Sequence, residues 1–256
     1  MSLGLSVTFI TLNEEQHIEA ALKSVSWADE IIVVDSGSQD RTVEIARQNG
    51  AQVFTNSWPG YGQQKNFAHE KARGPWVLNI DADERVSPQL AQEIQSAIAQ
   101  PGDAQGFSFP RKTYYLGRWI RHGGWYPNVL ARLGRKDHTR WSEPPVHEEL
   151  LVDGPVRTLV HPLDHYAFSS IQEQVLTTLR YSRLGSERLK QKGQRPNLLK
   201  LLIKPLGKFL ETYFLKRGFL DGLAGFIISI NAAHSLFLKY AYLFESELSV
   251  EDPNHR

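Results

Sequence analysis

The chain has 256 residues, of which 41% are hydrophobic and 22% are charged, enough to bury a sizeable core in one large domain or in one domain with an added lobe. The sequence contains no cysteine, which excludes disulfide frameworks, thiolate zinc sites and cysteine nucleophiles. The first apolar run, 5–10, is short and leads to Glu14 and Glu15 instead of a small-residue cleavage site. A cytoplasmic location is therefore expected.

Basic residues are concentrated in one part of the chain. Between Arg180 and Arg217 there are eleven Lys and Arg residues against two acidic residues, a balance of +9. Because the whole chain carries +1, the remainder carries −8. A basic segment of this kind suits an anionic surface, either membrane headgroups or nucleic acid.

The first hundred residues alternate between short β-branched runs and stretches with helical spacing, which predicts βαβ units and a parallel sheet. The expected strands are 5–10, 31–34, 52–54 and 76–80. The expected helices are 13–25 with Asn13 as N-cap, 40–49 with Asp40 as N-cap, 62–71, and a fourth that starts at Ser87 and Pro88 and ends near 100.

After Pro101 the sequence becomes rich in glycine, aromatic residues and arginine, and 107–160 is typical of short strands. We expect a mixed lobe over the carboxyl edge of the sheet, where open α/β sheets bind ligands. From Ile171 onward the pattern is helical. The predicted organisation is an α/β half (1–100), a mixed lobe of the same domain (101–170) and a helical region (171–256).

Lysines recur every four residues in the helical region, at Lys200, Lys204 and Lys208. Apolar residues occupy the other side of this helix, namely Leu199, Leu202, Ile203, Leu206, Phe209 and Tyr213. The pattern favours a helix in a membrane interface, and a helical hairpin that packs on the main domain is the alternative. Although 222–238 contains no charged residue, these 17 residues are too few and too polar for a membrane span.

Two aspartates follow the apolar run 76–80, at Asp81 and Asp83. If strand alternation continues, both side chains point the same way. Paired oxygen ligands at a strand end suit Mg²⁺ or Mn²⁺, which share their coordination with substrate phosphates. A helix-entry loop with acids favoured by the helix dipole is the structural alternative.

Another acid, Asp35, ends a second apolar run and opens the segment Ser36–Thr42. Asp35 is positioned to accept a hydrogen bond from a nucleobase or ribose, although ordinary capping by Ser38 and Asp40 explains the same pattern. The glycine-rich signatures of dinucleotide-binding and P-loop proteins do not occur in the sequence. Dinucleotide redox chemistry and P-loop hydrolysis are therefore disfavoured.

Together with Phe9–Glu15, these segments resemble family 2 glycosyltransferases of the GT-A type. Three loops match that family in the same order, and the resemblance covers about residues 5–100 of this chain. The resemblance implies a GT-A, Rossmann-like α/β sheet that binds a nucleotide sugar. It assigns the nucleotide to Thr11, Asn13, Glu14 and Asp35, a position near the diphosphate or base to Lys65, and the metal to Asp81 and Asp83. Asp81 is expected to reach the metal directly or through ribose and water.

Further motifs, among them 123–127, Arg132-Leu133, 145–149 and 220–222, resemble the bacterial lipopolysaccharide inner-core β-1,4-glucosyltransferases (WaaE/KdtX type) over nearly the whole chain. This resemblance implies a UDP-glucose donor and a lipid-anchored heptose acceptor. It also implies a peripheral location on the cytoplasmic face of the inner membrane. A polyprenyl phosphate acceptor is an alternative within the class.

Inverting transfer needs a group that neutralises the charge developing on the leaving diphosphate and a base that takes the proton of the acceptor hydroxyl. We expect Glu148 to be the base, with His147 and Glu149 as alternatives and with Asp83 or Glu84 as a competing assignment. A divalent metal is expected on Asp83 and Asp81, with His165 completing its shell. Arg132 joins Lys65 at the diphosphate, and Trp125 and Tyr126 offer flat faces to the acceptor sugar.

Two other functions are compatible with a nucleotide-binding sheet and acidic metal ligands. A sugar-nucleotide pyrophosphorylase normally opens with a glycine-rich phosphate loop, which 11–15 does not provide. A membrane-bound scaffold would bind the nucleotide sugar without turnover. Nucleic acid is not an expected partner, because the basic segment is interleaved with leucines and lacks a known reading module.

Overall fold

The computed structural model of the chain describes residues 4–143 and 148–251, and it contains two compact units. The first unit takes the residues up to Lys112 together with Asn128–Tyr166. The second takes Thr113–Pro127 and the residues from Ala167 onward. The stretch expected as the middle lobe, 101–170, therefore contributes to both units, which are described in turn.

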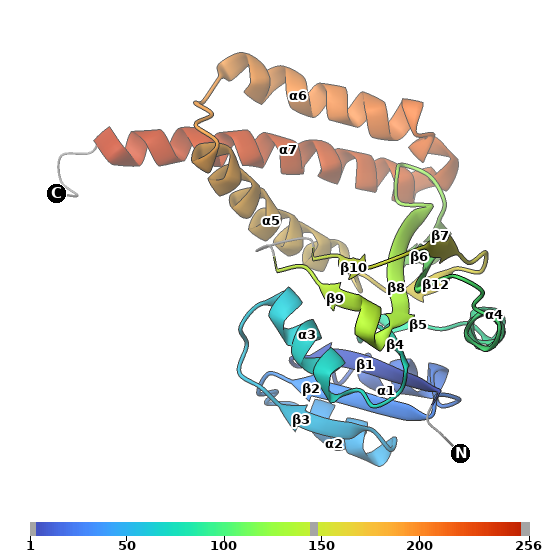
Figure 1. Cartoon of the computed structure of the whole chain (residues 1–256). Helices are drawn as coiled ribbons and strands as arrows, with labels where there is room; N and C mark the ends of the chain where they lie inside the picture. The colour runs from blue at the N-terminus through green and yellow to red at the C-terminus, as the bar shows by residue number, and fades with distance from the viewer. Residues whose placement is uncertain (1–3, 144–147, 252–256) are drawn as a thin grey trace. The chain divides into compact units, whose positions relative to one another are not determined.

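A mixed sheet forms the first unit (Figure 1). Its strand order is β3-β2-β1-β4-β8-β6-β12-β5, with β11 beside β6. The pairs β2–β3, β1–β2 and β1–β4 are parallel, whereas β8 is antiparallel to both β4 and β6. The strands are β1 (Leu5–Thr11), β2 (Glu30–Asp35), β3 (Gln52–Thr55), β4 (Trp76–Asn79), β5 (Glu84–Arg85), β6 (Gly106–Tyr115), β8 (Asn128–Arg135), β11 (Val156–Thr158) and β12 (Leu163–His165). A separate hairpin consists of β9 (Thr139–Trp141) and β10 (Leu150–Val152), and a short 3₁₀ turn, η1 (Lys136–His138), precedes it.

Strand alternation distributes the core over both faces of this sheet. Val33 packs in one buried cluster with residues of α1 and α4, whereas its neighbours Ile32 and Val34 pack in another with residues of α3. The helices of this unit are α1 (Ile18–Ser24), α2 (Thr42–Gln48), α3 (Tyr61–Lys71) and α4 (Pro88–Ala99). With helices on both faces, β2 carries the continuous apolar run 31–34, as buried parallel strands do.

The predicted strands of the first hundred residues are confirmed as β1 to β4, and the helix predicted at 62–71 is confirmed as α3. Ser87 caps α4, because its hydroxyl accepts a hydrogen bond from the Leu90 amide. The prediction that Asn13 caps the first helix is wrong. Asn13 has a positive φ of 58° and its side chain accepts a hydrogen bond from the Gln39 amide, so the helix begins only at Ile18.

Three long helices dominate the second unit (Figure 1). Its small core brings Tyr115 and Ile120, from a β-hairpin, against Ala224 and Ile228 of the last helix. The elements are the end of β6, β7 (Arg118–Ile120), α5 (Ile171–Gln191), α6 (Leu198–Leu210), the π-helical turn η2 (Glu211–Leu215), the 3₁₀ turn η3 (Gly218–Asp221) and α7 (Gly222–Glu251). The expected start of helical structure near Ile171 is confirmed. Among the described residues, one helical stretch, 218–248, is long and apolar enough to cross a membrane on length and composition alone.

Candidate active site

The carboxyl ends of β1 and β2 lie side by side, with Thr11 paired to Asp35. The buried Asp35 carboxylate accepts hydrogen bonds from the Thr11 and Ser38 hydroxyls and from the amides of Gly37 and Ser38. Four donors fill the accepting positions of a carboxylate. Asp35 therefore ties the loops after these two strands together, and its role toward a nucleotide stays a prediction.

The other two residues expected at the nucleotide belong to the same connected loops. The Asn13 amide donates to the Ser38 hydroxyl, and the Glu14 amide donates to the Thr42 hydroxyl. Asn13 is exposed and Glu14 is half-buried. The structure thus brings Thr11, Asn13, Glu14 and Asp35 to one edge of the sheet, where parallel strands place ligand-binding loops.

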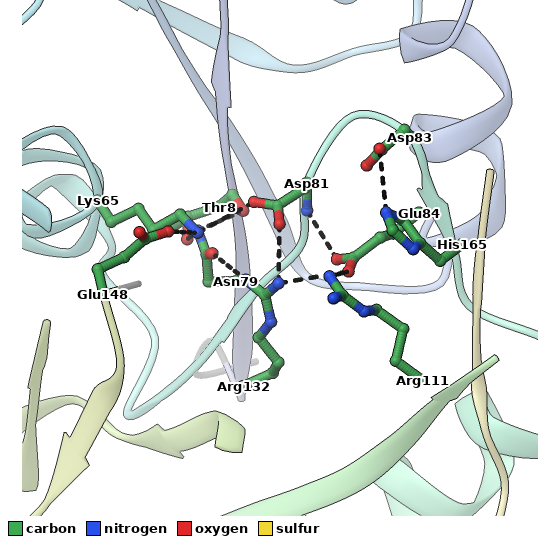
Figure 2. A network of polar contacts seen from close by, with 10 residues as sticks. All are labelled: Thr8, Lys65, Asn79, Asp81, Asp83, Glu84, Arg111, Arg132, Glu148 and His165. Carbon is green, nitrogen blue, oxygen red and sulfur yellow. Dashed lines mark hydrogen bonds and ion pairs between the residues drawn. The ribbon is translucent and has the colours of Figure 1, made fainter. Parts of the chain in front are cut away.

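Lys65, from α3, joins two carboxylates that are far apart in sequence. Its ammonium lies 3.1 Å from Asp81 Oδ1 and 2.8 Å from Glu148 Oε1 (Figure 2). It also lies 4.5 Å from the centre of the Trp141 ring. The residue is only 2% exposed, so this cation depends on its partners for solvation.

Arg132, from β8, occupies the other side of Asp81. Its Nη2 is 2.7 Å from Asp81 Oδ2 and 3.3 Å from Glu84 Oε1, and its Nη1 donates to Asn79 Oδ1 at 3.2 Å (Figure 2). Glu84 is completely buried and is also contacted by Arg111 at 3.2 Å. We call Lys65, Arg111, Arg132, Asp81, Glu84 and Glu148 the core network.

The charges of the core network compensate one another, with three cations against three carboxylates. Burial disfavours the ionised form of Asp81, but the charges of Arg132 and Lys65 outweigh it, so the pKa of this carboxyl lies well below its ordinary value. Burial likewise opposes the charge on Arg132, and Asp81 and Glu84 overcome this, which raises the pKa of the guanidinium. Asp81 and Arg132 are therefore ionised throughout the physiological range.

Asp83 has a different partner from Asp81. The segment from Asp81 to Glu84 is a turn, closed by a hydrogen bond from the Glu84 amide to the Asp81 carbonyl. Because this turn interrupts strand alternation, the two aspartates do not share one direction, contrary to the prediction (Figure 2). The Asp83 carboxylate lies instead 3.2 Å from His165 Nε2 of β12.

The expected metal ligands are thus only partly gathered. Asp83 and His165 offer an oxygen and a nitrogen suited to Mg²⁺ or Mn²⁺, and both side chains are partly accessible. Both oxygens of Asp81 face Lys65 and Arg132. In the part of the chain that the structure describes, no three acidic or histidine side chains form a metal-binding group. The full ligand set stays a prediction.

Glu148 reaches Lys65 from the hairpin of β9 and β10. Both ends of its loop are fastened, because the Ser142 amide donates to the Glu149 carbonyl and the Glu149 amide donates to the Ser142 hydroxyl. Glu149 itself is exposed, and His147 lies outside the described residues. A pocket of about 310 Å³ opens here, lined by 129–132, Trp141 and 148–150.

Trp125 and Tyr126, expected at the acceptor sugar, belong to the second unit. The Trp125 ring packs against Tyr115 and Phe168, at centroid distances of 5.8 and 6.2 Å. Trp125 is therefore part of the aromatic packing of that unit. The acceptor-binding role of both residues stays a prediction.

Trp141 was not among the residues expected at the site, yet its ring is contacted by Lys65 and by Arg132, at 4.5 and 5.7 Å. Glu84 was expected only as a competing base, whereas two arginines and the Asp81 amide engage its carboxylate. A weak signal was available for Asn79, because a polar residue that ends a buried strand often faces a site. Nothing in the spacing pointed to Trp141.

Comparison with known proteins identifies the family. The family model described as "Glycosyl transferase family 2" matches residues 6–149. A lipopolysaccharide core biosynthesis glycosyltransferase, LpsC, of Rhizobium meliloti is 30% identical over 98% of this chain and 96% of its own length. An uncharacterized glycosyltransferase of Rickettsia bellii is 32% identical over 95% of this chain and 87% of its own length.

Among solved structures, glucosyl-3-phosphoglycerate synthase of Mycobacterium tuberculosis, in a complex with Mn²⁺, UDP and glucosyl-3-phosphoglycerate, is 29% identical. The similarity covers 45% of each chain, with a TM-score of 0.37. The family match favours glycosyl transfer over nucleotide-sugar synthesis and over a scaffold without turnover. The predicted α/β fold class and the resemblance found in the sequence are confirmed: this chain belongs to glycosyl transferase family 2.

Proposed function

We propose that this enzyme transfers a hexose, glucose in the first instance, from UDP-hexose to a heptose of the lipopolysaccharide inner core with inversion at the anomeric carbon. The observation that carries the proposal is the core network, which joins Lys65, Arg132, Asp81 and Glu148 near the carboxyl edge of the parallel strands. The LpsC relative, which is named for lipopolysaccharide core biosynthesis, supports the acceptor class.

In the proposed reaction the acceptor hydroxyl oxygen forms a bond to the anomeric carbon as the bond from that carbon to the diphosphate oxygen breaks. UDP leaves with the bonding electrons, and the hydroxyl proton passes to Glu148. Glu148 suits this role because it borders the pocket and is partly accessible. Glu84 suits it poorly, since its carboxylate is completely buried and held by Arg132 and Arg111.

Lys65 and Arg132 are the cations proposed to face the diphosphate. Both are already compensated by carboxylates, so an incoming diphosphate brings negative charge that the core network does not offset. A bound Mg²⁺ or Mn²⁺ would supply the positive charge that offsets the diphosphate, acting as a Lewis acid. Asp83 and His165 are the residues that would hold it, and Asp81 is the further expected ligand.

The donor and acceptor can be tested directly. The purified protein is incubated with Mn²⁺, a panel of nucleotide sugars, and either a heptose-terminated inner-core glycolipid or a polyprenyl phosphate, and the products are weighed by mass spectrometry. We expect the glycolipid to gain one hexose from UDP-glucose. Hexose transfer to the polyprenyl phosphate alone would contradict the proposed acceptor.

Metal binding has its own test. Because Asp83 is the proposed carboxylate ligand, Asp83→Asn should abolish the Mn²⁺-dependent part of UDP binding measured by titration calorimetry. Asp103→Asn, in the turn after α4, is the matched control and should leave that binding unchanged. Mn²⁺-dependent UDP binding that survives in Asp83→Asn would remove Asp83 from the metal site.

The proposed location is the cytoplasmic face of the inner membrane, with the basic helical region of the second unit facing the lipid. The basic balance of 180–217 supports this location, since anionic headgroups attract such a segment.

A further inference from the structure

Helix α6 exposes an unusual amount of apolar surface. None of its thirteen residues is buried, and Leu202 is 62% exposed. Its exposed apolar side chains follow one stripe at helical spacing: Leu198, Leu199, Leu202, Ile203, Leu206 and Leu210. Lys200, Lys204 and Lys208 follow a separate stripe on the same helix. Asn197 caps its first turn by accepting a hydrogen bond from the Lys200 amide, so the helix has a defined start.

Helix α7 continues this apolar surface. Its exposed large side chains, Leu223, Phe226, Ile230, Phe237 and Leu248, recur at helical spacing along one side. The opposite side carries Ala224 and Ile228, which are buried, and Ser235, which is bonded to Ser182 of α5. The Phe226 ring meets the half-buried rings of Phe209 at 6.0 Å and Tyr213 at 5.6 Å, so α7 packs on the end of α6 beside these stripes. We call these two stripes together the hairpin face.

We propose that the hairpin face inserts into one leaflet of an anionic lipid bilayer, with the lysines of α6 in the headgroup layer and with α7 lying along the membrane instead of crossing it. This inference deepens the membrane location given above and rests on it. A contiguous exposed apolar surface of this kind marks an interaction site in a soluble protein. Apolar residues on one side of a helix and lysines on the other are typical of helices that lie in the interface.

The lysines favour lipid over a second protein chain. Protein interfaces are depleted in lysine, whereas anionic headgroups attract it. The π-helical turn that follows α6 adds Phe214 and Leu215, both exposed, and the residues after it are Lys216 and Arg217. Apolar and basic groups therefore adjoin along α6 and the turn that follows it, where Lys208 and Lys216 also pair with Glu211.

The packing of α5 argues against a membrane span by α7. The Ser182 hydroxyl of α5 lies 3.0 Å from both the carbonyl and the hydroxyl oxygen of Ser235, within the uncharged segment 222–238. If that segment crossed the hydrocarbon, the exposed Arg180 and Arg183 of α5 would enter it as well. Charged side chains facing lipid at that depth are strongly disfavoured. With α7 parallel to the membrane, α5 stays on the aqueous side.

The first experiment measures co-sedimentation with vesicles that contain no glycosyl acceptor, so its outcome does not depend on the transfer reaction. We expect the full chain to bind phosphatidylglycerol–phosphatidylcholine vesicles. Leu202→Glu together with Leu206→Glu should weaken binding at least tenfold. Leu176→Glu is the matched control, because Leu176 is 57% exposed on α5 outside the hairpin face, and its binding should be unchanged. Circular dichroism and thermal unfolding confirm that each variant is folded.

Two results of this experiment would overturn the proposal. One is vesicle binding that the paired leucine substitutions leave intact. The other is a concentration-dependent dimer in sedimentation equilibrium that these substitutions abolish while vesicle binding is absent, because the hairpin face would then bind a second copy.

The second experiment tests the orientation of α7. Since the chain has no cysteine, two variants each introduce one thiol: Arg217→Cys, just before the 3₁₀ turn that leads into α7, and Glu247→Cys, near the carboxyl end of α7. A membrane-impermeant maleimide added outside sealed vesicles should label both bound variants to the same extent. Protection of the thiol at 247 until detergent is added would show that α7 crosses the bilayer and would contradict the proposal.

Discussion

Lys65 lies in a place where an ammonium group has almost no contact with water, held by Asp81, Glu148 and the face of Trp141. Removing one partner of a buried ion pair leaves the remaining charge without compensation, which costs more than the pair contributes. The same contacts place this cation between the acid expected near the metal and the expected base. Stability and chemistry therefore depend on one side chain.

Lys65→Met should lower the free energy of unfolding by about 3 kcal/mol and abolish hexose transfer, because Asp81 and Glu148 lose their shared cation. Chemical denaturation and a transfer assay measure both effects. Lys23→Met is the control, since Lys23 forms only an exposed pair with Glu19 and its loss should change the stability far less. A Lys65→Met protein as stable as the wild type would contradict the described network.

For single residues, the sequence predicted which side chains lie in the site better than it predicted which of them contact one another. Asp81, Lys65, Arg132 and Glu148 were each expected at the site, and the structure joins them in one network. The expected pairing of Asp81 with Asp83 was not found, because a turn that no spacing rule indicates separates the two carboxylates. The contact of Lys65 and Arg132 with Trp141 depends on how elements that are distant in sequence pack together, and a single sequence does not give that information.

Helix α3 and the β9–β10 hairpin approach closely because α3 carries a glycine at the contact. A Cβ at Gly62 would lie 2.0 Å from the Ser142 carbonyl oxygen. The Asn66 side chain, one turn later, accepts from the Trp141 amide and donates to the Trp141 carbonyl. These contacts set the position of strand β9 and of Ser142, which is hydrogen-bonded to Glu149 next to Glu148.

Gly62→Ala should therefore destabilise the protein and slow transfer, although alanine favours a helix by about 0.5–1 kcal/mol over glycine. Gly207→Ala is the matched control in α6, where an added Cβ meets nothing within 4 Å, so that variant should gain stability. Thermal unfolding of the two variants checks the difference. A stabilised Gly62→Ala protein would show that the close approach is not needed.

For the helices and strands, the hydrophobic periodicity of the sequence predicted which elements exist and of which type more securely than it predicted where they begin and end. The strands 5–10, 31–34, 52–54 and 76–80 and the helix 62–71 are present within a residue or two. The first helix begins at Ile18 instead of Asn13, because Asn13 bonds to the next loop and not to the helix. A capping residue and a loop-bridging residue have the same sequence signature, and only the neighbouring loop distinguishes them.

Over the whole molecule, stability should depend on carboxylates held by hydrogen bonds. Burial disfavours the charge on Glu30, but the Ser6 hydroxyl and the Arg73 amide and side chain outweigh it, which lowers the pKa of Glu30. The pKa values of Asp81 and Glu93 are lowered as well. Groups with a depressed folded pKa stabilise the protein above their unfolded pKa of about 4, and that stability is lost as the pH falls.

Glu30→Gln should consequently lower the free energy of unfolding by about 1–3 kcal/mol at pH 7, because charge-assisted hydrogen bonds are lost. The difference from the wild type should shrink as the pH falls below about 4, since the wild-type carboxylate then becomes protonated. Denaturation curves over a series of pH values measure this. Glu70→Gln, at an exposed position on α3, is the matched control. A Glu30→Gln deficit that is independent of pH would contradict the assigned cause.

The most direct test of the account compares Glu148→Gln with Glu149→Gln in single-turnover transfer from UDP-glucose, alongside donor binding by calorimetry. If Glu148 is the base, the single-turnover rate of Glu148→Gln should fall about 10²-fold or more while donor binding is kept, and Glu149→Gln should retain the wild-type rate. A near-normal rate in Glu148→Gln, or a loss confined to Glu149→Gln, would contradict the assignment on which the proposed mechanism depends.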